Sequence, residues 1–170
     1  MSAQTVRLMA FDVDGVFTDG ALYYSADGDA LKVFNILDGL GLKLLQKAGI
    51  QTAIISGRAS PMVERRFTEL NVDFVIQNRE DKGQALAELA RKLNFEQKDL
   101  GYMGDDFPDL TTLAVAGFFA SVPNAPNLVQ EEAAFVTNSF GGHGAVRELC
   151  EFLLKAQGFD LLKLFQMESA

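Results

Sequence analysis

Short apolar runs alternate with helix-like segments along almost the whole chain, and this alternation constrains its fold more than any other feature. The runs suit buried strands at residues 6–11, 52–55, 73–76, 100–103, 117–122 and 135–136. Helical spacing or helix-start residues occur at 39–48, 61–70, 82–93, 109–116, after Pro126 and at 145–156. The alternation predicts an α/β fold, a doubly wound parallel sheet with right-handed crossovers. We expect one domain over residues 1–170, since no linker or repeat divides the chain.

Two segments stand outside this alternation. Residues 21–35 predict a β-hairpin, with strands at 21–24 and 31–34 around a turn centred on Asp27-Gly28. The hairpin follows the first strand almost directly, so it would stand over a site at that strand's end or contact another subunit. The C-terminal tail, residues 158–170, is weakly specified.

Residues with known capping preferences set the expected starts of two helices. Asp38 is the predicted N-cap of helix 39–48, which Gly49 would end. Ser60 is the predicted N-cap of helix 61–70, with Pro61 in the first turn.

Polar side chains follow four of the predicted strands at the point where each strand ends. In chain order these side chains are Asp12 and Asp14, then Ser56 and Arg58, then Lys82, and then Asp105 and Asp106. Ligands of doubly wound sheets bind outside the carboxyl ends of the strands. We therefore expect the four groups to converge on one site, although a turn, a helix cap or a solvated lysine would explain each of them singly.

The spacing of Asp12 and Asp14 indicates what such a site can do. In extended backbone, residues i and i+2 face the same side, so both carboxylates would crowd one spot beyond the strand. A divalent cation or unequal protonation relieves that crowding. The pair therefore suits a nucleophile, Asp12, beside Mg²⁺ and an acid/base, Asp14. Asp105 would add a carboxylate for the metal, with Asp109 in support.

A phosphoryl group suits the remaining polar groups. The Ser56 hydroxyl and the backbone N–H of Gly57 can hold phosphate oxygens, and Lys82 can neutralise a phosphoryl charge. The cations Lys43, Arg58, Arg65 and Arg66 belong to an exposed face by default, and one or two of them are candidates to pair with a substrate carboxylate.

Composition excludes several other classes of site and partner. One His and one Cys make a zinc site, a Ser-His triad or an intrachain disulfide improbable. The net charge of −8 argues against nucleic acid as a partner. An uncharged stretch at 110–130 contains Pro123 and Pro126 and is read as helix, strand and loop. We expect a cytoplasmic protein with no membrane segment.

Four sequence motifs of this chain resemble those of the haloacid dehalogenase superfamily of phosphatases. They are Asp12-Val13-Asp14-Gly15-Val16, Ile54-Ile55-Ser56-Gly57-Arg58, Lys82 and Gly104-Asp105-Asp106. Within that superfamily the chain is similar to the 3-deoxy-D-manno-octulosonate 8-phosphate phosphatases, a subgroup without a cap domain. The finer similarity covers Asp14 to Gly20, Phe34 to Gly41 and Gly141 to Glu148 as well.

The resemblance implies a Mg²⁺-dependent enzyme of lipopolysaccharide precursor synthesis, usually a homotetramer with the hairpin around its axis. Asp12, the Asp14 backbone carbonyl and Asp105 would hold the metal, and Asp12, Asp14, Ser56 and Lys82 would be catalytic. The expected contacts of the phosphorylated sugar acid are Asn35, Asp38, Gly39, Lys43, Gly57, Arg58, Arg66, Asp106 and Asp109. Many relatives carry Arg where this chain has Leu37, and Lys or Arg where it has His143.

Three alternatives stay open from the sequence. The chain could be a phosphatase for another acidic sugar phosphate, or an inactive sugar-binding subunit. A receiver-type signalling domain also combines clustered Asp, Lys and magnesium, but it keeps its phosphoacceptor on a different strand from its acidic pair.

Overall fold

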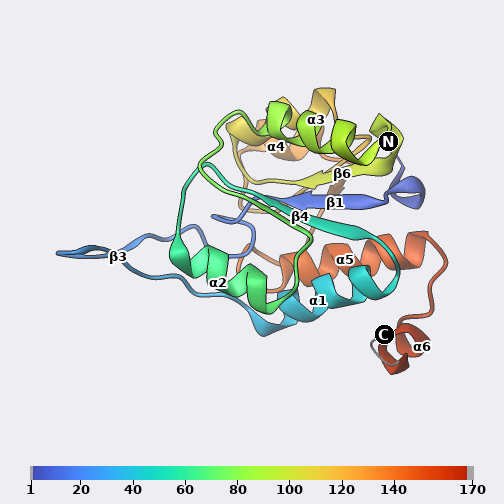
Figure 1. Ribbon diagram of the computed structural model, residues 1–170, viewed down its shortest axis with the longest axis horizontal. Helices are drawn as coiled ribbons and strands as arrows, with labels where there is room; N and C mark the ends of the chain where they lie inside the picture. The colour runs from blue at the N-terminus through green and yellow to red at the C-terminus, as the bar shows by residue number, and fades with distance from the viewer. Residues whose placement is uncertain (1, 168–170) are drawn as a thin grey trace.

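A parallel six-stranded sheet forms the centre of the molecule (Figure 1). The computed structural model describes residues 2–167. The strands are β1 (Leu8–Phe11), β4 (Gln51–Ile55), β5 (Phe74–Ile76), β6 (Leu100–Met103), β7 (Phe118–Ser121) and β8 (Phe135–Val136), in the order β5-β4-β1-β6-β7-β8. β1 therefore lies at the centre, parallel to β4 on one side and to β6 on the other. All six predicted strands are confirmed, with ends shifted by at most two residues.

Helices cover both faces of the sheet, as a doubly wound fold requires. On one face lie α1 (Ile36–Lys47), α2 (Pro61–Glu69) and α5 (Ala145–Ala156), and on the other lie α3 (Lys82–Leu93) and α4 (Asn127–Glu132) (Figure 1). Every residue of β1, β6 and β7 is buried, so these strands form the middle of the core. Because the carboxyl ends of all six strands meet at one edge, the polar groups that follow them are brought together there.

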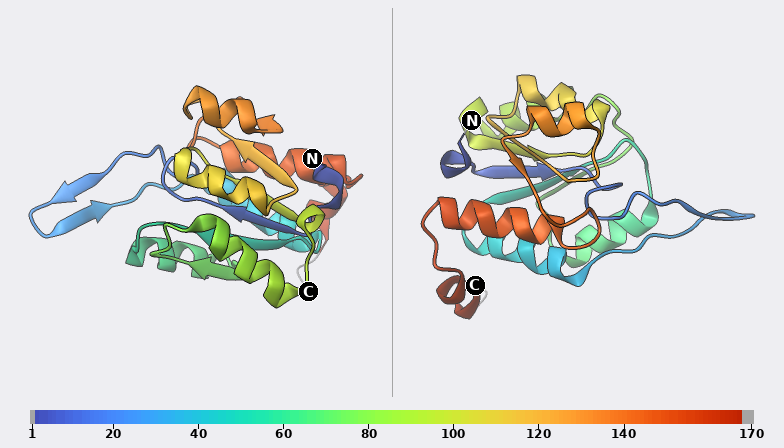
Figure 2. Two further views of the ribbon diagram at one scale, coloured as in Figure 1. Left: turned by 90° about the horizontal axis from the view of Figure 1, so that it is seen from above. Right: turned by 180° about the vertical axis from the view of Figure 1, so that it is seen from behind.

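The predicted hairpin is present and projects from this edge of the molecule (Figure 2). Its strands are β2 (Tyr23–Ser25) and β3 (Gly28–Leu31), which pair only with each other. The strands lie closer to the turn than predicted, because the turn is one residue earlier and the pairing is irregular at Tyr23/Tyr24. None of the other connections within residues 2–167 is long enough for a cap domain. The α/β prediction with a hairpin and no cap is confirmed.

Helix α1 begins three residues earlier than predicted, and Asp38 is not its N-cap. Asn35 takes that position, and its Oδ1 accepts a hydrogen bond from the backbone N–H of Leu37 (2.9 Å). Asp38 is buried inside the first turn, where Oδ1 accepts a hydrogen bond from the backbone N–H of Arg147 in α5 (2.9 Å). Asp38 thus caps a different helix from the one predicted. The C-terminal end at Gly49 is as expected, with a φ of +79°.

Ser60 is the N-cap of α2 and Pro61 lies in its first turn, so this prediction is confirmed in position. The Ser60 hydroxyl makes no capping hydrogen bond; its backbone N–H donates to Gln77 Oε1 (2.8 Å) instead. The helix predicted at about 109–116 is present as a 3-10 helix, η3 (Phe107–Ala114). Hydroxyls at Thr111 and Thr112 donate to carbonyls three residues earlier, which suits the tighter 3-10 turn.

The weakly specified tail contains a short helix, α6 (Leu161–Gln166), capped by Asp160. Residues 168–170 of the predicted tail lie outside the described residues. The sole cysteine, Cys150, is buried in α5 as a free thiol. Among residues 2–167, the structure has no helix that is long and apolar enough to cross a membrane.

Candidate active site

Strand β1 ends in a tight turn that carries Asp12 and Asp14. The Asp12 N–H still donates to the Met103 carbonyl of β6 (2.9 Å), so the carboxylate leaves the sheet at a fixed point. The backbone N–H groups of Val16, Phe17 and Thr18 then all donate to the Val13 carbonyl. The Asp12 side chain is 10% exposed, whereas the Asp14 side chain is 23% exposed. The two carboxylates thus share one turn but differ in their access to solvent.

Glycines let the neighbouring loops approach this turn closely. A Cβ atom on Gly15, whose φ is +87°, would lie 2.0 Å from Asp105 Oδ2. A Cβ atom on Gly141 would lie 1.8 Å from the Gly15 carbonyl oxygen. The Gly142 N–H donates to the Val16 carbonyl (3.0 Å), which ties the loop before α5 to the acidic turn. We call this contact between residues 15–18 and 141–142 the glycine joint.

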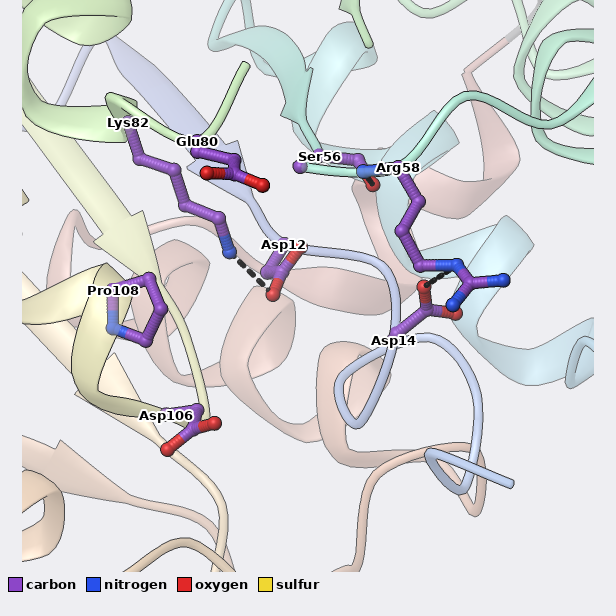
Figure 3. Close-up of a pocket in the computed structure, with 9 residues that line it drawn as sticks. Asp12, Asp14, Ser56, Arg58, Glu80, Lys82, Asp106 and Pro108 are labelled. Atoms are coloured by element: carbon purple, nitrogen blue, oxygen red, sulfur yellow. Dashed lines mark hydrogen bonds and ion pairs between the residues drawn. The ribbon is translucent and has the colours of Figure 1, made fainter. Parts of the chain in front are cut away.

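Lys82 reaches Asp12 from the start of α3 (Figure 3). Its Nζ donates to Asp12 Oδ2 (2.6 Å) and to Asp109 Oδ1 (2.7 Å). Burial lowers the pKa of Lys82, but the charges of Asp12 and Asp109 outweigh that effect and leave it raised. The lysine is therefore a buried cation fixed beside the expected nucleophile.

Asp109 organises this part of the site without reaching its surface. It is 0% exposed, and its Oδ1 also accepts from Tyr102 Oη (2.9 Å). Its Oδ2 accepts from the backbone N–H groups of Asp105 (3.0 Å) and Asp106 (3.1 Å). Both Asp109 oxygens are thus engaged, and the residue orients Lys82 and the Asp105 loop.

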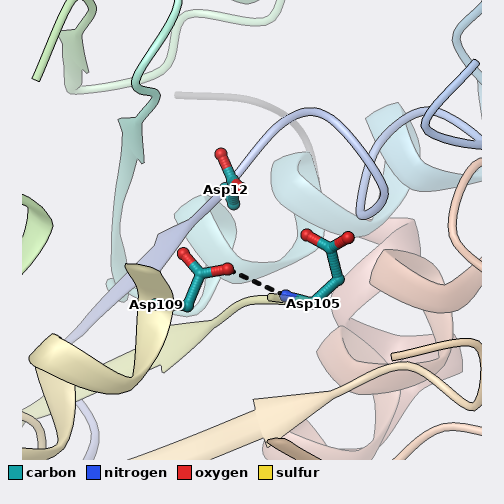
Figure 4. A group of neighbouring side chains, drawn as sticks. All are labelled: Asp12, Asp105 and Asp109. Carbon is teal, nitrogen blue, oxygen red and sulfur yellow. Dashed lines mark hydrogen bonds between the residues drawn. The ribbon is translucent and has the colours of Figure 1, made fainter. Parts of the chain in front are cut away.

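Three carboxylates gather where a metal would be needed (Figure 4). One oxygen each of Asp12, Asp105 and Asp109 lies within 4.8 Å of the others. Burial, followed by the charges of Asp12 and Asp109, raises the pKa of Asp105 to about 8. Burial, followed by the charge of Asp109, raises the pKa of Asp12 to about 6, although Lys82 opposes this. Asp105 Oδ1 is buried with no hydrogen-bond partner. A hard divalent cation would satisfy that oxygen and offset the clustered charge, so the residues fit magnesium.

A cavity of about 570 Å³ adjoins this cluster, and Asp12 is the member of the three that lines it. It is lined by Asp12, Asp14, Ser56, Gly57, Arg58, Glu80, Lys82, Asp106 and Pro108. Figure 3 shows Asp12 and Lys82 on one side and Asp14 paired with Arg58 on another. Ser56 is 2% exposed, and its Oγ accepts from the Arg58 N–H (3.3 Å). The predicted strand-end groups therefore converge on one cavity.

Comparison with known proteins decides the family. A model of the haloacid dehalogenase-like hydrolases matches residues 74–149. The 3-deoxy-D-manno-octulosonate 8-phosphate phosphatase of Haemophilus influenzae is 38% identical over 155 residues, which cover 91% of this chain and 86% of that protein. The chain belongs to this phosphatase family. Its Escherichia coli K12 relative of the same name is 38% identical over 156 residues, covering 92% of this chain and 83% of that protein.

Solved structures of the phosphatase family have the same fold. The Moraxella catarrhalis phosphatase, in complex with magnesium, phosphate and KDO, matches with a TM-score of 0.88 and 46% identity over 91% of this chain and 89% of that chain. The cobalt-bound Haemophilus influenzae phosphatase matches with a TM-score of 0.92 and 36% identity over 98% of this chain and 100% of that chain. The sheet and hairpin described above are thus those of a capless phosphatase.

Several residues expected to bind substrate by resemblance to this family lie outside the cavity lining. Asn35 caps α1 and its Nδ2 donates to the Gly142 carbonyl (3.4 Å), while Asp38 holds the start of α5. Gly39 lies against the Arg66 guanidinium, since a Cβ atom there would be 2.6 Å from Arg66 Nη2. Lys43 is exposed on α1. Asn35 therefore supports the glycine joint, and Asp38 fixes the first turn of the helix that follows it.

Two residues of the site were missed from the sequence: Glu80, which lines the cavity, and Lys32, which contacts a lining residue. Glu80 lines the cavity from the loop before α3, and Figure 3 shows it between Lys82 and Ser56. Lys32 lies just after β3 and forms an ion pair with Asp14 Oδ1. Glu80 could have been named as a candidate from the sequence, because it lies only two residues before Lys82. No local pattern marked Lys32, because its partner Asp14 is 18 positions away in the sequence and lies beside it only in the folded chain.

Proposed function

We propose that this chain is a Mg²⁺-dependent phosphatase that hydrolyses 3-deoxy-D-manno-octulosonate 8-phosphate to the free sugar acid and phosphate. One observation carries the proposal: Asp12 lines the cavity, accepts a hydrogen bond from buried Lys82 and lies close to Asp105 and Asp109. Family membership supports the sugar phosphate as substrate. We further propose that the chain acts as one domain, as a homotetramer in the cytoplasm, in lipopolysaccharide precursor synthesis.

In the proposed first step, an Asp12 carboxylate oxygen attacks phosphorus opposite the sugar oxygen. A bond forms between Asp12 and phosphorus as the bond from phosphorus to the sugar oxygen breaks, which leaves an aspartyl phosphate. Asp14 gives its proton to the departing sugar oxygen. Lys82 keeps a positive charge beside the phosphoryl group, while Ser56 Oγ and the Gly57 N–H hold its oxygens.

In the second step, water attacks the phosphorus of the aspartyl phosphate. Asp14, now deprotonated, takes a proton from that water, and the bond between phosphorus and the Asp12 oxygen breaks. Phosphate leaves, and both aspartates return to their starting states. Asp14 thus changes protonation state twice per turnover, which suits its more exposed position in the acidic turn.

The metal would be held by the Asp12 carboxylate, the Asp14 backbone carbonyl and Asp105. Bound there, Mg²⁺ supplies positive charge that stabilises the transferring phosphoryl group. Asp109 is a weaker candidate for a ligand because both of its oxygens already accept hydrogen bonds.

Other observations support the finer parts of the proposal. Arg58 lines the cavity and can pair with the substrate carboxylate. Apolar side chains exposed on and around the hairpin suit burial between subunits, and they are Leu22, Tyr23, Tyr24, Leu31 and Val33.

The test is phosphate release from 3-deoxy-D-manno-octulosonate 8-phosphate and a panel of other sugar phosphates, with and without magnesium. We expect preference for the first substrate and dependence on the metal. Asp12→Asn should abolish turnover while the protein keeps its melting temperature within a few degrees. A flat profile, or preference for another acidic sugar phosphate, would contradict the substrate. Substantial activity in Asp12→Asn would contradict the nucleophile.

A further inference from the structure

The lysine at the base of the hairpin is buried against the expected acid/base. The Lys32 side chain is 4% exposed, and its Nζ pairs with Asp14 Oδ1. Burying an ammonium group is costly unless an opposite charge accompanies it. The Asp14 carboxylate supplies that opposite charge. The position of this carboxylate and the position of the hairpin base are therefore fixed by one contact.

Asp14 has a second cationic neighbour, but the contact is weaker. Arg58 Nε lies 3.9 Å from Asp14 Oδ2, and the Arg58 side chain is 42% exposed. Solvent screens an exposed pair at this distance, whereas the Lys32 pair is shielded. Lys32 is thus the cation with the greater influence on where the Asp14 carboxylate stands.

The other strand of the hairpin also contacts the cavity. Arg58 Nη2 donates to the hydroxyl of Tyr24 in β2 (3.2 Å). Tyr24 lies in the outgoing strand, and Lys32 follows the returning strand, β3. Both sides of the hairpin are therefore joined to the cavity wall formed by Asp14 and Arg58, which Figure 3 shows as a pair.

We propose that Lys32 is a positioning residue, which holds the Asp14 carboxylate on the cavity wall and so couples the placement of the hairpin to the proton-transfer step. The inference rests on the proposed function for the role of Asp14, but the contact itself does not. Lys32 touches no reacting atom in this proposal; it acts through Asp14. Because a displacement of about 1 Å of a catalytic group can cost about 100-fold in rate, one such contact is sufficient to matter.

The catalytic arm of the test compares two leaving groups. Lys32→Met, Lys32→Arg and the control Lys98→Met are assayed on the sugar phosphate and on p-nitrophenyl phosphate, whose leaving group needs no proton. Lys98 suits the control because it is also paired with a carboxylate, Glu96, but is 65% exposed and does not line the cavity. The value of kcat/KM is compared because it reports only the steps up to the aspartyl phosphate.

We expect Lys32→Met to lower kcat/KM for the sugar phosphate by about 100-fold and to leave that for p-nitrophenyl phosphate nearly unchanged. Lys32→Arg should recover much of the loss, and Lys98→Met should behave as the wild type. Equal losses on both substrates would indicate a structural role and overturn the proposal, as would an unchanged rate in Lys32→Met.

The second arm needs no activity. Amide hydrogen exchange over residues 21–35 is measured in Lys32→Met, Asp14→Asn and the double variant. If the two side chains hold each other, each single substitution speeds exchange at the hairpin base, and the double variant is no faster than the singles. Additive effects, or no effect, would overturn the coupling. If the wild type hydrolyses neither substrate, the proposed function is refuted. The hydrogen-exchange measurement then still tests whether Lys32 and Asp14 hold each other.

Discussion

Gly15 offers a test of how the acidic turn and the Asp105 loop fit together. In Gly15→Ala the new methyl group would lie 2.0 Å from Asp105 Oδ2, and real contacts of this kind are not shorter than 3.0 Å. The carboxylate must therefore retreat by at least about 1 Å. It can do so, because it is the end of a short side chain rather than backbone. We therefore expect the clash to weaken magnesium binding and to lower kcat more than it lowers the stability of the fold.

A second cost comes from the backbone of Gly15. Its φ of +87° is in the left-handed region, where a residue with a Cβ atom loses about 1–2 kcal/mol. For a protein of this size, each 1 kcal/mol lowers Tm by about 2–4 °C. Gly49→Ala is the matched control, because Gly49 has a φ of +79° but no atom within 4 Å of the place that its new methyl group would take. The two variants share the backbone cost, and only Gly15→Ala disturbs Asp105.

We expect both alanine variants to lose Tm by similar amounts in a thermal melt without metal. Calorimetric titration should show Mg²⁺ binding weakened by about 10–100-fold in Gly15→Ala alone. At saturating magnesium, kcat should fall about 100-fold in the same variant. If Gly15→Ala binds magnesium and turns over like Gly49→Ala, then the contact between Gly15 and Asp105 does not govern the metal site.

Two further predictions concern the buried carboxylates. Because the pKa of Asp105 is raised from 3.8 to about 8, its contribution to the stability of the metal-free protein is complete below 3.8 and is lost as pH rises through about 8. Magnesium competes with that proton, so the rise in Tm on adding Mg²⁺ should be larger at pH 8 than at pH 6; equal rises would refute the argument. Asp38→Ala removes the hydrogen bond to Arg147 at the start of α5 and should cost about 1 kcal/mol in a denaturant titration, with KM unchanged. A raised KM at unchanged stability would instead favour the substrate contact expected by resemblance.

The sequence is sufficient for features that depend on neighbouring residues. Strand β1 and the acidic turn are contiguous, so the order of residues alone places Asp12 and Asp14 at a strand end. The same holds for Ser56, Lys82 and Asp105, since a parallel sheet brings the ends of its strands to one edge. The sequence predicts that these groups converge, and the structure brings Asp12, Ser56 and Lys82 to one cavity, with Asp105 close to Asp12.

Features that depend on distant partners could not be predicted in this way. Asn35 and Asp38 are both good capping residues, and what separates their roles is Arg147, which is 109 positions from Asp38 along the chain. Lys32 presented the same difficulty, because a lysine beside a hairpin strand is ordinarily solvated. The 3-10 form of η3 is accompanied by hydrogen bonds from the Thr111 and Thr112 hydroxyls to carbonyls three residues earlier, which helical spacing does not reveal.

The glycine joint separates the parts of this enzyme that can vary from those that cannot. At Gly141 a side chain would meet the backbone of Gly15 and Thr18, and at Gly15 it would displace the Asp105 carboxylate, so a substitution at either place disturbs the acidic turn or the metal site. Glu80, by contrast, is exposed where it lines the same cavity. New substrate preferences are therefore expected to arise by substitution at exposed lining positions of this kind, while the phosphoryl chemistry of the acidic turn is inherited unchanged.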